Sequence, residues 1–404
     1  MYRFYKVLKI AFILLMSCGI GQSKQAKPEK VYRIVYEIKS NEWYKQQAEL
    51  WKLELDKDPT NQEAWYNYYN ANRYADFEDI ESQDKKDKLD TIIGDMEKAI
   101  PGTYVYYLLK YWNNCDIHDI SLIEKAYQLE PNKPDTYYPF IVHYEFLQQK
   151  EKLREFCQKL YHSRDIAPWL INYNYNVLMS LEKNAILITN GDNDTYPIWM
   201  LQNALDVRQD IMVLNISLTP TPSYLERKLE NSDISIDYSA LRDKAKQESP
   251  SGSHGSFKGN FMQNLCLLIA EKYPHLPVYF ALTVYGEYIE KIRKNLFIVG
   301  LAYQYAEQRI DNIALIQKNL EKNFRLDYLN YDWYHEQYPG RTIRNKLHMN
   351  YIIPMIMLGD HYIQSGDNYK AERWNLLALH LAEQAEDQEA ITKIKNKEFE
   401  YHNK

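Results

Sequence analysis

Residues 185–189 constrain the fold most, because this short, uncharged run breaks directly into the acidic loop 190–195. A run this short and apolar is typical of a strand buried on both faces, as in a parallel sheet. Loops at the carboxyl ends of such strands are where α/β proteins usually place binding and catalytic groups. The loop is therefore the first candidate site in the chain.

Further strands are predicted after this loop. Residues 196–207 have a helical pattern and 211–216 are a second apolar run, which together predict one βαβ crossover. The run 277–283 predicts a third strand, and 296–301 a fourth, antiparallel at an edge. The expected fold class is α/β within a mostly α-helical chain, with a small three- to four-stranded, mainly parallel domain over 181–305.

The composition favours helices over most of the remaining chain. Of 404 residues, 45% are hydrophobic and 26% charged, which is ordinary for a globular protein and excludes extensive disorder. Only 13 residues are glycine, which argues against a large Rossmann-type or all-β domain with many tight turns. The 37 tyrosines supply large packing surfaces with one polar end, a chemistry that helical repeats and carbohydrate-binding surfaces both use.

A recurring spacing of proline and aromatic residues indicates helical repeats. Pro59 is followed six residues later by Trp65, and Pro131 by Tyr137. These offsets resemble the tetratricopeptide repeat, in which a proline ends one helix pair and an aromatic residue opens the next. A fuller copy of the repeat lies near the C-terminus and consists of Leu358, Gly359, Tyr362, Ala371 and Ala378.

We therefore expect tetratricopeptide-type hairpins over 31–180, and C-terminal helices with one such repeat over 306–404. Hairpins of this kind stack into a curved array whose groove commonly binds a partner segment. A protein partner in this groove is the expected partner. The alternative is that tyrosines such as Tyr66, Tyr69 and Tyr104 only pack helix against helix.

The first residues predict export. Basic residues precede an apolar stretch that is too short to span a bilayer, and small residues follow it, as in a secretory signal peptide over 1–23. Residues 15–18 also resemble the bacterial lipobox, in which Cys18 becomes the lipidated first residue of the mature chain. Lipidation at Cys18 and cleavage near Ser23 both stay open. The expected location is the periplasm, or the bacterial outer membrane through a lipid anchor.

Charge and cysteine usage argue against other classes of protein. Removing 1–23 takes away three basic residues and no acid, so that the net charge of −6 becomes −9. Such an acidic chain without a basic run is a poor nucleic-acid binder. No other segment is long and apolar enough to span a membrane, so membrane contact is expected only through a lipid anchor. Cys115, Cys157 and Cys266 lack metal-binding spacing; either Cys115 pairs with Cys157 or the thiols are free.

A distinctive string in the central region of the chain is centred on Gly191-Asp192-Asn193-Asp194, and it is accompanied by 185–199, Gln202, 207–208, 210–218, 277–281 and 299–303. In these segments the chain resembles the soluble C-terminal region of a bacterial family of multi-spanning, glycosyltransferase-like membrane proteins of largely unassigned function. The resemblance implies a soluble α/β fold followed by tetratricopeptide helices. The membrane half of that family is not found in this sequence, so the resemblance does not imply transferase activity.

Asp192 and Asp194 are the candidate metal ligands. Two carboxylates in this spacing after a strand can hold Mg²⁺ or Mn²⁺ against a phosphate. The alternative, which needs no cofactor, is that Asp194 or Thr195 caps the following helix, with Pro197 in its first turn and Gly191 allowing a sharp turn before it. A cap needs only one side chain, so capping leaves the role of Asp192 open.

Asn193 and Thr195 complete the candidate binding loop, and His254 is the nearest candidate imidazole. His254 lies in a Ser/Gly stretch that could close over the loop, although a lone histidine there is more often solvated. The sequence favours an exported, envelope-associated scaffold that binds a protein or an envelope glycan. The alternative is a metal-dependent enzyme, or an accessory subunit, that acts on a phosphorylated or sugar-bearing envelope substrate at Asp192 and Asp194.

Overall fold

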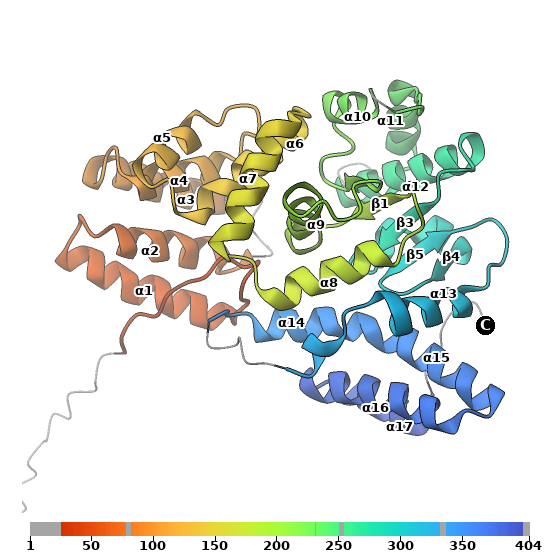
Figure 1. The fold of residues 1–404 in the computed structure, drawn as a ribbon. Coiled ribbons are helices and arrows are strands. Elements are labelled where there is room, and N and C mark those ends of the chain that lie inside the picture. The colour runs from red at the N-terminus through yellow and green to blue at the C-terminus, as the bar shows by residue number, and fades with distance from the viewer. Residues whose placement is uncertain (1–25, 78–81, 231, 250–253, 332–336, 399–404) are drawn as a thin grey trace, which may run out of the picture.

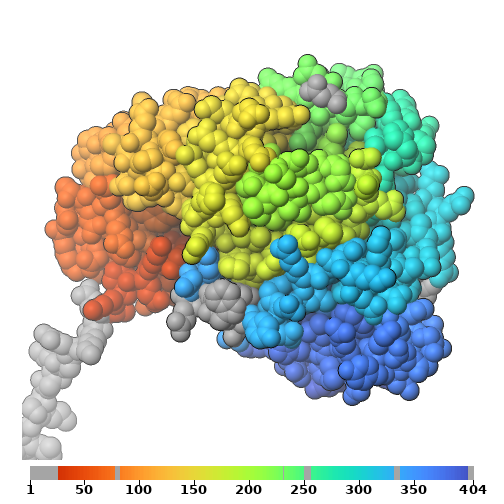
Figure 2. All heavy atoms as spheres, in the orientation of Figure 1, coloured from red at the N-terminus to blue at the C-terminus, as the bar shows by residue number. Residues whose placement is uncertain are grey.

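The computed structural model describes residues 26–77, 82–230, 232–249, 254–331 and 337–398 (Figure 1). The predicted signal peptide and Cys18 lie outside these residues. Helical hairpins form the N-terminal part, a small sheet with its own helices follows, and the C-terminal helices form a layer along one side (Figures 1 and 2). The chain is therefore mostly helical, with a small α/β unit between two helical parts, as the sequence predicted.

The N-terminal part is built from helix pairs of the tetratricopeptide type. Helices α1 and α2, α4 and α5, and α6 and α7 pack against each other as hairpins. The bounds of these helices are α1 (Asn41–Lys57), α2 (Gln62–Tyr74), α3 (Gln83–Ala99), α4 (Tyr104–Asn114), α5 (Ser121–Leu129), α6 (Tyr137–Phe146), α7 (Lys150–Ser163) and α8 (Pro168–Met179).

The proline–aromatic spacing has a direct physical basis in the structure. The indole Nε1 of Trp65 donates to the carbonyl oxygen of Pro59 at 2.8 Å, and the Tyr137 hydroxyl donates to that of Pro131 at 2.8 Å. Each aromatic side chain thus reaches back over six residues to satisfy the proline's own carbonyl, which lies in the turn between two helices and so has no partner in either helical ladder. The turn between α1 and α2 and the connection between α5 and α6 use the same contact, which explains why the spacing recurs.

The sheet has five strands in the order β2-β1-β3-β5-β4. Strand β1 pairs in parallel with both β2 and β3, whereas β3 with β5 and β5 with β4 are antiparallel pairs. The strands are β1 (Ile186–Thr189), β2 (Met212–Asn215), β3 (Val278–Ala281), β4 (Leu296–Ile298) and β5 (Ala302–Tyr305). All four residues of β1 and of β3 are buried, which accounts for their continuous apolar sequence.

The sheet is larger and less parallel than the three- to four-stranded, mainly parallel sheet that the sequence predicted. The predicted fourth strand, 296–301, is antiparallel at an edge, but it ends at Ile298 and turns into β5. Gly300 makes this turn with a φ of +143°, and a Cβ there would meet the Ser180 and Phe324 side chains at 2.8 Å. The hairpin therefore depends on a single glycine inside an otherwise apolar run.

The helices around the sheet begin earlier than predicted. Helix α9 begins at Asp192 rather than near Tyr196, and α12 begins at His254 rather than near Asn260. The bounds of these helices are α9 (Asp192–Ala204), α10 (Pro222–Leu229), α11 (Tyr238–Gln247) and α12 (His254–Lys272).

The C-terminal helices contain the second region of the tetratricopeptide type, in which α15 packs along α16. A Cβ on Gly359 would meet the Asn375 side chain at 2.7 Å, and Ala371 and Ala378 are buried, so small residues do lie where the two helices approach closely. The helices are α13 (Asn312–Lys318), α14 (Arg341–His348), α15 (Ile352–Ser365), α16 (Asn368–Gln384) and α17 (Gln388–Asn396). Among the described residues, no helix has the length and apolar character needed to cross a membrane.

The three cysteines in the described part of the chain are free thiols, so Cys115 and Cys157 are not paired. Cys115 is exposed, whereas Cys157 and Cys266 are buried, and burial raises the pKa of both buried thiols. Because the thiolate is the reactive form, we expect only Cys115 to react quickly with a thiol reagent in the native protein. The measurement is a Cys115→Ser comparison in a chain that starts after Cys18. A fast phase that survives this substitution would contradict the expectation.

Candidate functional site

The acidic loop lies at the carboxyl end of β1, where the chain connections diverge. From β1 the chain continues to β2 on one side, and from β2 it crosses back to β3 on the other side. In open α/β sheets, a crevice forms outside the strand ends at such a switch point. The loop 190–194 after β1 and the loop 282–286 after β3 both line one groove there.

Asp194 joins these two loops. Its carboxylate accepts hydrogen bonds from the backbone N–H groups of Asn190 at 2.8 Å and Gly191 at 2.7 Å, and from the Thr283 hydroxyl after β3. Burial raises the pKa of the Asp194 carboxyl, and these three donors oppose that shift. The predicted capping role of Asp194 therefore takes a different form, because the carboxylate reaches back to amides before the helix.

Thr195 is buried beside Asp194 and joins the strands to α9. Its hydroxyl lies 2.8 Å from the Thr189 hydroxyl and accepts from Asn215 Nδ2 at 3.0 Å. Thr195 thus connects the ends of β1 and β2. It is not available as a surface binding group.

Pro197 lies in the second turn of α9, inside the helix, rather than in the first turn as predicted. A proline in a helix leaves the carbonyl four residues earlier without its donor, and here that carbonyl belongs to Asn193. Asn174 Nδ2 on α8 donates to it at 2.8 Å. The Asn193 side chain donates to the carbonyl oxygen of Val35 at 3.1 Å, so Asn193 holds the chain that precedes α1 against the loop.

Gly191 does not make the sharp turn that the sequence suggested. Its φ is −142°, which any residue adopts, and no other side chain or backbone atom lies within 4 Å of the position of a Cβ there. The change of direction after β1 comes from the early start of α9, which Asp194 stabilises.

Asp192 faces outward and pairs with an arginine that the sequence did not single out. Its carboxylate lies 3.7 Å from Arg33 Nη2, and about half of its side chain is exposed, compared with 14% for Arg33. The Arg33 guanidinium lies 5.0 Å from the ring centroids of both Trp112 and Tyr138. Partial burial raises the pKa of the Asp192 carboxyl, and Arg33 opposes that shift.

Two cavities meet at Asp192. The first, which we call the tyrosine cavity, has a volume of about 330 Å³, and its aromatic lining includes Tyr36, Tyr66, Tyr138, Trp169, Tyr196 and Tyr338. The second, which we call the apolar groove, has a volume of about 1020 Å³, and its lining includes Ile34, Ile38, Phe77, Leu282, Tyr285 and Ile343. Both cavities are also lined by Val35, Asp192 and Asn193, which separate them.

Both carboxylates that the sequence suggested as metal ligands already have partners in the structure. Both Asp194 oxygens already accept hydrogen bonds, and the Asp192 carboxylate has a guanidinium as its neighbour. No group of three or more His, Cys, Asp or Glu side chains suited to a metal occurs in the part of the chain that the structure describes. His254 opens α12, and its side chain lies outside the described positions. Mg²⁺ or Mn²⁺ at Asp192 and Asp194 thus gains no support from this arrangement.

Two signals in the sequence could have revealed part of this site. Thr283 follows the third predicted strand, and the carboxyl ends of neighbouring parallel strands meet at one edge of a sheet. Pro197 inside a helical pattern implies a carbonyl that needs a donor from elsewhere. Arg33, by contrast, lies before the first helix in a segment without periodicity.

Together, the helical hairpins and the small sheet with the apolar groove at its strand ends define a helical-repeat protein with an embedded α/β unit. Residues 170–250, a minority of the chain, match the family model of TMEM260-associated domain 2. This segment runs from α8 through β1, α9 and β2 to α11, and thus contains the acidic loop. No curated protein matches the chain in sequence.

The solved structures that the chain matches include a monomeric IFIT1 mutant with m7Gppp-AAAA and yeast Tom70. The IFIT1 structure is 16% identical, with a TM-score of 0.28, and the match covers 84% of this chain and 68% of that one. The Tom70 structure is 14% identical, with a TM-score of 0.26, and the match covers 88% of this chain and 59% of that one.

Proposed function

We propose that the protein is an exported, envelope-associated binding protein of the tetratricopeptide type, which holds a segment of a partner protein in the apolar groove. The basic and apolar residues at the start of the sequence support export, and Cys18 would supply a lipid anchor. The acidic net charge argues against a nucleic-acid partner. An envelope glycan is the second class of partner, for which the tyrosine cavity has suitable chemistry.

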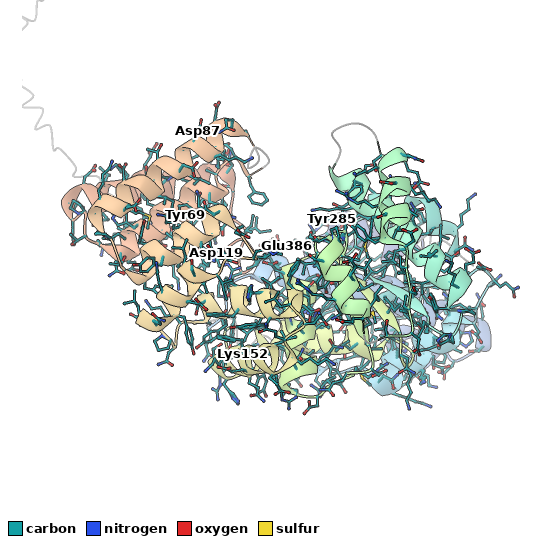
Figure 3. All side chains as sticks on the ribbon, turned by 90° about the horizontal axis from the view of Figure 1, so that it is seen from above. Tyr69, Asp87, Asp119, Lys152, Tyr285 and Glu386 are labelled. Atoms are coloured by element: carbon teal, nitrogen blue, oxygen red, sulfur yellow. The ribbon has the colours of Figure 1, made fainter. Side chains whose placement is uncertain are left out.

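The observation that carries this proposal is the convergence of exposed apolar side chains on one groove. Ile38 is 46% exposed, Phe77 44% and Tyr285 60%, and all three line the groove. They come from the segment before α1, the end of the N-terminal hairpin and the loop after β3. Tyr285 lies on the side of the α/β unit that faces the N-terminal helices (Figure 3). Exposed apolar patches of this kind commonly mark interaction sites.

The size of the groove favours a protein segment over a small ligand. About 1020 Å³ is at the upper end of the range for small-molecule pockets, and this groove opens between three parts of the chain. Its lining combines apolar and aromatic side chains with polar and charged ones such as Lys39, Asp76 and Lys346, as in interfaces where apolar anchors of a partner are surrounded by a polar rim. An enzyme would need acid, base or cationic groups that converge on a reacting atom, whereas Asp194 is engaged in structure.

A photo-crosslinking experiment tests the proposed groove. With benzoylphenylalanine in place of Tyr285, we expect one defined protein to be cross-linked in cells, and Phe77→Glu to reduce this product about tenfold because a buried charge opposes docking. The matched control places the cross-linker at Tyr369, which is 81% exposed on α16, outside the groove. Equal labelling from both positions, or no product from position 285, would contradict the proposal.

A further inference from the structure

We propose that the tyrosine cavity is a binding site for a neutral saccharide. This inference rests on the proposed function, because both assign a binding role to the protein. It places a sugar in the tyrosine cavity, whereas the proposed function places a protein segment in the apolar groove. The cavity lies where α6, α8, α9 and the segment before α1 meet, next to Asp192. Its volume of about 330 Å³ is near the lower end of the range for ligand pockets, which suits one or two sugar rings.

The aromatic lining suits the apolar faces of a sugar ring. Tyr138 and Tyr196 form an edge-to-face pair with centroids 5.0 Å apart, and Trp169 lines the same cavity from α8. The negative face of an aromatic ring attracts weakly positive C–H groups, which one face of a pyranose presents. A phenol also keeps a polar end that can hydrogen-bond to a ring hydroxyl.

The charges in the lining favour an uncharged ligand. The cationic lining residues are Lys30, Arg33 and Arg164, and the anionic ones are Asp135, Asp165 and Asp192. Three charges of each sign cancel, so the cavity has no net attraction for an anion such as phosphate or for an organic cation. The Arg33 guanidinium already lies against the rings of Trp112 and Tyr138, so these ring faces are not free to bind a second cation.

The polar groups provide both donors and acceptors, which is what a hydroxyl requires. Arg33 Nη1 is buried and has no hydrogen-bond partner among the residues that the structure describes. Asp165 Oδ2 accepts from the Tyr138 hydroxyl at 2.6 Å and also from the Tyr36 hydroxyl. A sugar hydroxyl can accept from Arg33 while it donates to a carboxylate, so one ligand class satisfies both kinds of group.

Calorimetric titration of the whole protein tests this inference. The probes are neutral mono- and disaccharides (glucose, galactose, mannose, N-acetylglucosamine and their disaccharides), with choline and inorganic phosphate as cationic and anionic comparisons. We expect at least one neutral sugar to bind and to change tryptophan fluorescence through Trp169, whereas choline and phosphate give no heat. The absence of heat with every sugar at millimolar concentration, or binding of choline or phosphate instead, would overturn the proposal.

Two variants locate the binding. Asp165→Asn preserves volume but removes a charged acceptor, and we expect it to weaken sugar binding about tenfold while thermal unfolding confirms that the variant folds. Phe77→Glu alters only the apolar groove and should leave sugar binding unchanged. Sugar binding that is unaffected by Asp165→Asn would place the sugar elsewhere and overturn the assignment. If the unsubstituted groove gives no cross-linked product from position 285 while sugar binding is intact, that result would count against the proposed protein partner alone.

Discussion

Replacement of Asp194 by alanine is expected to lower the free energy of unfolding by about 3 kcal/mol, because it leaves several donors without their acceptor. The Asn190 and Gly191 amides and the Thr283 hydroxyl all donate to this one carboxylate. No other side chain joins the loop after β1 to the loop after β3 among the hydrogen bonds of the described residues. The variant should therefore loosen the start of α9 and the groove beside it. Urea unfolding followed by circular dichroism measures the loss.

The sequence offers a matched control two residues away. Asp192→Ala removes a carboxylate that is about half exposed and pairs with Arg33 at 3.7 Å, so its expected effect on the free energy of unfolding is within about 0.5 kcal/mol. Asp194→Asn keeps one acceptor and should fall between the two. An Asp192→Ala variant that loses as much stability as Asp194→Ala would show that the carboxylates have equivalent roles, as in a shared metal site.

The prediction of the strands and hairpins from the sequence rests on local physics. The run 185–189 is apolar because β1 is covered on both faces, and Trp65 and Tyr137 recur because each contacts a proline carbonyl six residues earlier. Such patterns depend only on residues that are close together in the sequence, so they can be recognised without the structure. The boundaries at 1–23, 31–180, 181–305 and 306–404 stay a prediction.

The sequence-based predictions differ from the structure where residues that are distant in the sequence determine the local conformation. Helix α9 could not be extended back to Asp192 from the sequence, because Pro197 in its second turn is tolerated only through the bond from Asn174 to the Asn193 carbonyl. Likewise β5 depends on Gly300, whose conformation is set against Ser180 and Phe324. Neither contact is visible in a local pattern.

The sequence predicted where the acidic loop lies but not which residues surround it. The acidic loop does lie at a strand end beside two cavities, yet Asp194 and Thr195 stabilise the fold. The residues that give the tyrosine cavity its character, Arg33 and Asp165, come from a segment before the first helix and from the turn between α7 and α8. Only the stacking of the hairpins on the α/β unit brings them to Asp192.

Replacement of Asn176 on α8 by leucine is expected to lower the free energy of unfolding by about 3 kcal/mol. Its side chain is fully buried, accepts from the Arg325 backbone N–H at 2.8 Å and donates to the Arg325 carbonyl at 2.7 Å. It also donates to the Tyr351 hydroxyl at 2.7 Å. Leucine fills a similar volume but leaves the Arg325 backbone groups and the buried Tyr351 hydroxyl without this partner, so the cost comes from lost hydrogen bonds and not from a cavity.

This substitution should separate the C-terminal helices from the rest of the molecule more than it disturbs either part, because Arg325 and Tyr351 belong to the C-terminal segment and Asn176 to α8. Asn203→Ala is the matched control, since its amide donates only within α9, to the Trp199 carbonyl at 2.8 Å, and its expected cost is below about 1 kcal/mol. Hydrogen exchange measured along the chain gives the result. Asn176→Leu should raise exchange in α15 and α16 before it does so in the sheet, and a uniform rise over the whole chain would show that the contact does not link separable parts.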